Sequence, residues 1–331
     1  MKPPVLGFFP PLAGVGSSFL AYHLAWMYAE LGLSVVVADL DPMAELSKMF
    51  LEDERLGPFW SERESSATVA AALQSSIAGK SEAADVHLEE VRDESSALSS
   101  RLLVGDLLLS SFEDELSAAW RRLREGEPGA IAGVSVFRSV FEGALRAGGD
   151  LLIVDLGPGL GVLNRSIWVA LDYMVLPVSL DYLSTPALRR MGPILQSWEE
   201  EWMRGTSGSP PTLADMVGYV VLRSPLRLDL PGAFYEHSLH LLSREYWRSV
   251  QGTPLTREME LEADPACLGI LKPYHHLISL ARDARKPIFL LKPADGAVGS
   301  HAQSAQDAYQ DFARLAQGIA ARIGLKSLGH L

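Results

Sequence analysis

A short loop near the start of the chain has the residue types and spacing to bind a phosphate group. The apolar run 5–9 predicts a buried strand, and a helical pattern opens at Ser17 after a loop of small residues. Backbone N–H groups at a helix N-terminus attract an anion, and the helix dipole adds partial positive charge there. Gly14 and Gly16 let the loop turn tightly and approach a phosphate closely. The candidate nucleotide-binding residues of this segment are Ala13, Gly14, Val15, Gly16, Ser17, Ser18 and Phe19.

The cation that usually completes such a loop is missing. A working phosphate loop ends in Gly-Lys-Ser/Thr, where the lysine reaches the β- and γ-phosphates and the hydroxyl ligates magnesium. Here Ser17 occupies the lysine position, and Ser18 keeps the hydroxyl and is a candidate magnesium ligand. No lysine or arginine occurs between Lys2 and Lys48. The sequence therefore predicts a phosphate cradle without its lysine.

Three aspartates follow two other predicted strands. Asp39 and Asp41 come after a β-branched run, and Asp155 ends the apolar run 151–154 before a Gly-Pro turn. Ligands gather at such strand ends in open α/β sheets, and an aspartate of this kind holds magnesium through water. Asp39 and Asp155 are thus candidate magnesium ligands, and Asp41 is a candidate catalytic residue. Alternatively, Asp39 or Asp41 caps the helix expected over 43–50.

Predicted strands alternate with predicted helices along most of the chain. This order indicates an α/β fold, P-loop NTPase-like, with a mainly parallel sheet and helices on both faces. We expect a single domain over 1–331, with a less typical excursion of helices and loops at about 51–148. Residues 81–100 read as a polar, acidic loop, and 287–293 read as the last strand.

The composition limits the classes of function. A net charge of −12 argues against a generally basic, nucleic-acid-binding surface, although a local basic patch is compatible with it. The single cysteine, Cys267, excludes an internal disulfide and a cysteine-cluster metal site. No apolar run reaches the about 18 residues of a membrane span. We therefore expect a cytoplasmic protein that does not associate with a membrane.

The order of these motifs resembles the ParA/MinD/Soj group of deviant-Walker ATPases, the partitioning and positioning NTPases. Residues 12–19 occupy the family's Lys-Gly-Gly-Val-Gly-Lys-Thr-Thr loop, and 39–43 match its Asp-x-Asp-Pro-Gln. Residues 155–161 match its Asp-x-x-Pro-x-x-Gly. Residues 170–178 and 282–289 resemble two later family segments, so the similarity runs over nearly the full length.

The resemblance implies cofactors, partners and further site residues. It implies ATP or ADP with Mg²⁺, a homodimer, a protein partner of the ParB or cargo-adaptor type, and weak DNA binding without sequence preference. The family's adenine base is flanked by segments that correspond here to Arg223, Pro293 and Asp295. The DNA-binding candidates are Arg282, Arg285 and Lys286.

Leu12 and Ser17 stand where the family has its two lysines, one for the dimer partner's phosphates and one for its own. Three interpretations follow. The first is a ParA-like protein with a degenerate site, weak or no ATP hydrolysis, and a scaffold or regulatory role. The second is an active ParA-like ATPase that binds ATP, Mg²⁺ and non-specific DNA, with a basic residue from elsewhere in its site. The third is a relative that keeps only the fold and binds another anionic ligand. For the second, the candidate cations are Lys48, Arg189, Arg190 and Arg223.

Overall fold

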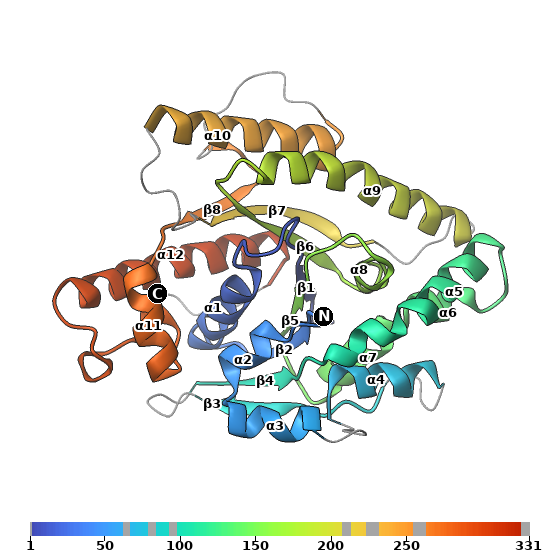
Figure 1. Ribbon diagram of the computed structural model, residues 1–331, viewed down its shortest axis with the longest axis horizontal. Helices are drawn as coiled ribbons and strands as arrows, with labels where there is room; N and C mark the ends of the chain where they lie inside the picture. Colours follow the sequence, from blue (N-terminus) through green and yellow to red (C-terminus); the bar gives the residue numbers. More distant parts are fainter. Residues whose placement is uncertain are drawn as a thin grey trace.

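The computed structural model describes residues 2–61, 67–78, 84–92, 98–206, 213–222, 232–253 and 263–325. These residues form one eight-stranded sheet with the strand order β3-β4-β2-β5-β1-β6-β7-β8 (Figure 1). The strands are β1 Val5–Phe8, β2 Val35–Leu40, β3 Glu89–Arg92, β4 Ser99–Leu103, β5 Leu151–Leu156, β6 Tyr173–Ser179, β7 Asp215–Leu222 and β8 Cys267–Leu271.

The sheet is parallel except at one edge, where β3 pairs antiparallel with β4. Strands β1, β2 and β5 are buried along their whole length, as expected for strands covered on both faces. Their carboxyl ends lie at the same edge of the sheet, and the register pairs Asp39 of β2 with Asp155 of β5. The predicted α/β class and the mainly parallel sheet are confirmed.

Helices cover both faces of the sheet. The core on one face includes α1 Ser17–Glu30, α2 Glu45–Phe50, α11 His275–Ala284 and α12 Ser300–Arg322. The core on the other includes α4 Val69–Ile77, α7 Val136–Arg146, α8 Val162–Trp168 and α9 Ser184–Gly205. In Figure 1, α1 and α11 lie to the left of the central strands β1 and β5, and α7 and α8 lie to their right. The remaining helices are α3 Asp53–Ser61, α5 Glu113–Arg124, α6 Ala130–Val134, α10 Gly232–Glu245 and the π-helix Tyr246–Val250.

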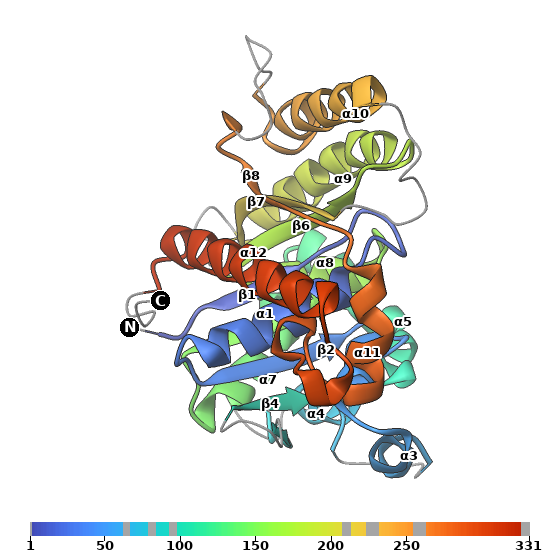
Figure 2. The same ribbon diagram turned by 90° about the vertical axis from the view of Figure 1, so that its left-hand side faces the viewer.

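The first helix is more deeply enclosed than its sequence suggests. The pattern predicts one apolar stripe, but every residue of α1 from Leu20 to Ala29 is buried. Helix α12 packs along α1, as both views show (Figure 2). The hydroxyl of Tyr28 donates a hydrogen bond to the carbonyl of Ala316 at 3.0 Å, which joins the two helices. The helix that carries the phosphate loop is therefore fixed in the centre of the molecule.

Two expectations about the chain were wrong. The segment 287–293 is not a strand, because Ile288–Leu290 and Pro293–Asp295 form 3-10 turns. Proline lacks the N–H that a central strand must donate, and the ring of Phe289 packs on Phe312 of α12 instead. The loop expected over 81–100 contains β3 and the start of β4. The strand β3 was missed because its charged residues give no apolar alternation.

Candidate functional site

The glycine loop connects the end of β1 to the start of α1, as predicted. Gly14 has φ 77° and Gly16 has φ 92°, a left-handed conformation that glycine adopts without a Cβ clash. Gly16 occupies the N-cap position of α1, and its carbonyl accepts the first helical hydrogen bond from Leu20. The N-terminus of a long, buried helix therefore opens directly behind the loop. This is the backbone arrangement of an anion-binding cradle.

Ser17, at the position of the missing lysine, turns toward the sheet. Its hydroxyl donates a hydrogen bond of 2.9 Å to Oδ1 of Asp155, and both side chains are buried. Among the described residues, no group is placed to form a hydrogen bond with the second oxygen of Asp155, Oδ2. Burial, and then the charge of Asp39, raise the pKa of Asp155 well above its usual range. Without a cation, Asp155 is therefore protonated far more readily than an exposed aspartate.

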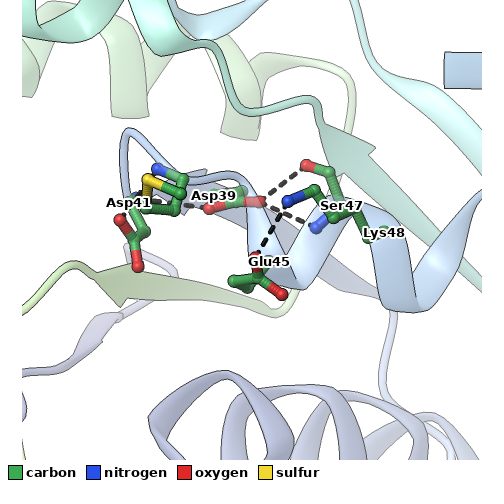
Figure 3. Close-up of polar contacts among 6 residues, drawn as sticks. Asp39, Asp41, Glu45, Ser47 and Lys48 are labelled. Carbon is green, nitrogen blue, oxygen red and sulfur yellow. Dashed lines mark hydrogen bonds and ion pairs between the residues drawn. The ribbon is translucent and has the colours of Figure 1, made fainter. Parts of the chain in front are cut away.

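Asp39 holds the start of α2. It accepts hydrogen bonds from the backbone N–H and the hydroxyl of Ser47, both at 2.7 Å, and from the N–H of Asp41 at 3.2 Å (Figure 3). Burial raises the pKa of Asp39 to about 7 despite these bonds. The helix N-cap itself is Ala44, at φ 50°. Asp39 therefore does cap α2, because it accepts a hydrogen bond from an N–H of the first helical turn. It does so from the end of β2, not from the N-cap position.

Asp41 lies at the edge of the cleft beside the glycine loop. Its Oδ1 accepts a hydrogen bond from the N–H of Met43 at 3.0 Å. The carboxylate lies directly against the backbone of Gly157, where an added Cβ would be 2.8 Å from Oδ1. Partial burial, and to a smaller extent Glu45, raise the pKa of Asp41. Of the three predicted site aspartates, Asp41 is the one that lines the cleft.

The cleft has a volume of about 290 Å³ and is lined by the loop, the first turn of α1, Asp41, Glu45 and the segment after β5. Among the described residues that line it, none is a lysine or arginine. The loop and helix N-terminus attract an anion, whereas Asp41 repels one, and Glu45 is paired with Lys48 at 2.8 Å. The arrangement is thus a phosphate cradle with an acidic rim.

The donor set fits a magnesium ion in part. Ser18 offers a hydroxyl, and the unpartnered Oδ2 of Asp155 offers a buried oxygen, the ligand type that magnesium prefers. Asp39 fits less well, because both its oxygens already accept hydrogen bonds. Within the described ranges, no three His, Cys, Asp or Glu side chains gather closely enough to hold a metal ion. A bound magnesium ion would offset part of the negative charge of Asp155 and of a phosphate.

Two of the basic residues proposed for the site already form ion pairs, one of them with Glu45 of the cleft lining. Lys48 pairs with Glu45 at 2.8 Å, and Arg189 pairs with Glu245 at 2.8 Å. Arg190 lies exposed on α9, and Arg223 lies outside the described residues. The structure therefore brings none of the described candidates into the lining of the cleft.

Pro293, Asp295 and the predicted DNA-binding residues lie around the end of α11, whereas Arg223 lies outside the described residues. Pro293 and Asp295 form a 3-10 turn, and Asp295 accepts two hydrogen bonds from Lys286, at 2.9 and 3.0 Å. Arg285 pairs with Glu52 at 3.0 Å. Arg282, Arg285 and Lys286 therefore form one cluster, but two of the three are already neutralised by carboxylates. Their role in DNA binding stays a prediction.

A family model described as AAA domain matches residues 11–204 of the chain. The chain belongs to this family. The matched segment contains the glycine loop, Asp41 and Asp155, but not the candidate residues around α11. No curated protein sequence matches the chain.

Three solved structures share the fold over nearly its full length. Cyanothece McdA(D38A) in complex with ATP is 14% identical, with a TM-score of 0.63 and 99% of both chains covered. A putative plasmid partition protein from Borrelia burgdorferi bound to AMPPNP is 14% identical, with a TM-score of 0.60, and 97% of this chain and 100% of that chain are covered. pNOB8 ParA bound to nonspecific DNA is 15% identical, with a TM-score of 0.62 and coverage of 97% and 99%. The ParA-like fold expected from the sequence motifs is confirmed.

Sequence reasoning missed two residues of this site. Ser47 holds Asp39, and Glu45 places a second carboxylate in the cleft. The sequence carried one signal for Glu45, an acidic residue in the first turn of a helix next to the Asp-x-Asp-Pro motif.

None of the described helices combines the length and apolar character needed to cross a membrane.

Proposed function

We propose that this protein is a ParA-like partitioning or positioning protein whose nucleotide site is degenerate and which acts as a scaffold or regulatory partner with weak or no ATP hydrolysis. The observation that carries this proposal is the lining of the cleft. Ser17 turns its hydroxyl onto Asp155, and the described lining contains Asp41 and Glu45 but no cation.

The physical argument is electrostatic. Phosphoryl transfer depends on positioned positive charge, and the loss of one such contact costs roughly a hundred- to a thousandfold in rate. Both lysine positions of the family are changed here, to Leu12 and Ser17. The remaining cradle can still contact a phosphate through its backbone N–H groups. Weak binding of ATP or ADP with Mg²⁺ is compatible with this site, whereas efficient hydrolysis is not.

If a nucleotide binds, each residue has a separate task. The cradle around Gly14 and Gly16 would hold the phosphates, and Ser18 and Asp155 would hold magnesium, which supplies the positive charge that the lysines no longer provide. Asp39 would keep α2 in place through Ser47. Asp41 faces the cleft and is the group that could orient a water molecule.

The partners follow from fold-level likeness. The relatives are a plasmid partition protein, McdA and a ParA bound to nonspecific DNA. We extend to this chain a homodimer, a protein partner of the ParB or cargo-adaptor type, and weak, salt-sensitive DNA contact through Arg282, Arg285 and Lys286. For this DNA contact, Arg285 and Lys286 would exchange their carboxylate partners, Glu52 and Asp295, for phosphate groups.

The test is ATP turnover by the purified full chain with Mg²⁺, measured as phosphate release, with Asp155→Asn as the matched variant. We expect both proteins to match the background, because the cleft lacks a cation. Magnesium-dependent turnover by the wild type that Asp155→Asn abolishes would establish an active ATPase and overturn the proposal. Calorimetric titration of ATP in the same buffer separates weak binding from none.

A further inference from the structure

A second cavity, of about 520 Å³, lies between α1, α2 and α11 on the face of the sheet that carries these helices. It shares only Phe19 and Glu45 with the phosphate cleft and contains no residue of the glycine loop itself. Its volume falls in the range of small-molecule sites, about 300–1,000 Å³. The sequence motifs of the phosphate cleft do not account for this second cavity.

Positive charge is concentrated at this cavity, although the whole chain carries a net charge of −12. Four cations line it against two carboxylates, and the six residues are Lys48, Arg282, Arg285, Lys286, Glu45 and Asp53. Lys48, Arg285 and Lys286 have ion-pair partners. In the part of the chain that the structure describes, no carboxylate pairs with the exposed Arg282. The cavity therefore offers an incoming anion a guanidinium that no described carboxylate already neutralises.

The opposite wall of the cavity is aromatic and uncharged. Phe19, Tyr22 and His23 follow one another at helical spacing on α1, and the rings of Phe19 and His23 are 3.9 Å apart between centroids. His23 is buried, and its Nε2 accepts a hydrogen bond from the N–H of Ile288 at 3.1 Å. Its Nδ1–H consequently donates to the carbonyl of Phe19 at 2.7 Å. Burial lowers the pKa of His23 to about 3, so the ring adds no charge.

We propose that this cavity binds a small aromatic anion, with its ring against Phe19 and Tyr22 and its acidic group at Arg282 and Arg285. A flat ring packs well on aromatic side chains, and a guanidinium binds a carboxylate, sulfonate or phosphate through charge-assisted hydrogen bonds. Met49, Ile278 and Ala281 complete an apolar surface for the body of the ligand. The inference does not require a nucleotide in the phosphate cleft.

The probe for this site is 8-anilinonaphthalene-1-sulfonate, an aromatic anion whose fluorescence reports binding. It is titrated without ATP into the full-length wild type, into the double variant Arg282→Ala/Arg285→Ala, and into Arg146→Ala. Arg146 is an exposed arginine on α7, on the opposite face of the sheet, and serves as the matched control. Circular dichroism confirms that all three proteins are folded. Adenosine monophosphate and 2-naphthoate are then added as competitors.

We expect saturable binding of one probe per chain, weakened about tenfold or more in the double variant and unchanged in Arg146→Ala. The uncharged analogue N-phenyl-1-naphthylamine should bind at least about tenfold more weakly than the sulfonate. Displacement by adenosine monophosphate would indicate a phosphate ligand, and displacement by 2-naphthoate a carboxylate. Equal binding to the double variant and the control, or to the charged and uncharged probes, would overturn the proposal. Neither outcome depends on whether the phosphate cleft hydrolyses ATP.

Discussion

Asp39 and Asp155 lie directly opposite each other on the neighbouring parallel strands β2 and β5, and both side chains are fully buried. Ionising both carboxylates in this position costs free energy, because burial and mutual repulsion favour the protonated form. The protonation of these two carboxylates should therefore depend on pH and on whether a cation is bound. Ser17 touches one member of the pair and Ser47 the other, which links this sensitivity to the loop and to α2.

The first prediction concerns stability and pH. Between pH 3.8 and about 7, the folded protein keeps a proton on Asp39 that the unfolded chain releases. The free energy of unfolding should therefore fall as pH rises, by about 2.5 kcal/mol for this group between pH 5 and pH 8. In Asp39→Asn the fall should be smaller by that amount. Urea unfolding at pH 5 and pH 8 measures it, with the exposed Asp283→Asn as control. If the free energy of unfolding fell equally in Asp39→Asn and the wild type between these pH values, the prediction would be wrong.

The second prediction concerns the empty lysine position. Ser17→Lys should tighten the binding of MgATP by about 1.5–3 kcal/mol, because one charge-assisted contact is restored to a cradle whose backbone is already formed. Calorimetric titration measures the change. Ser197→Lys adds the same charge on the exposed side of α9 and should leave ATP binding unchanged. A folded Ser17→Lys that binds no better than wild type would show that the loop is not a working cradle.

The third prediction concerns acid. The unfolded chain protonates His23 near pH 6.5, whereas the folded protein does so only near pH 3. Stability should therefore fall as pH drops below 6.5, by about 3 kcal/mol at pH 4.5 for this group. His23→Leu should lose less stability between pH 7 and pH 4.5, although it is less stable at pH 7 without the bond to Ile288. The matched control is His87→Leu, since the side chain of His87 is 51% exposed. An unchanged pH dependence in His23→Leu would refute the assignment.

The fourth prediction concerns packing between α9 and the π-helix. A Cβ at Gly192 would lie 1.9 Å from the carbonyl oxygen of Ser249, so Gly192→Ala should destabilise the protein by about 1–3 kcal/mol or more. Gly318 lies within α12 with nothing within 4 Å of an added Cβ. Gly318→Ala should therefore stabilise the protein by about 0.5–1 kcal/mol. Thermal unfolding compares the two, and equal effects would mean that the close contact is not real.

Local patterns were enough to predict the parts of the fold that carry the site. The apolar strands and the helix opening at Ser17 were predicted because their signals lie within a few neighbouring residues. The bond from Ser17 to Asp155 was not, since it joins residues 138 positions apart. The strand β3 was not predicted because three of its four residues are charged, so the sequence shows no alternation of apolar and polar residues there. The segment 287–293 was misassigned because an apolar run between two prolines was read as a strand.

The central position of β1 has a consequence for how the chain is synthesised. Val5 pairs with Leu152 of β5, and Leu6 pairs with Tyr173 of β6, so β1 lacks both of its neighbours until more than 140 further residues have been synthesised. Helix α1, buried on all sides in the finished protein, is exposed for the same interval. Such long-range parallel pairing folds slowly and exposes apolar surface to aggregation. The centre of the sheet around β1 therefore cannot close until residue 179, the end of β6, has been synthesised.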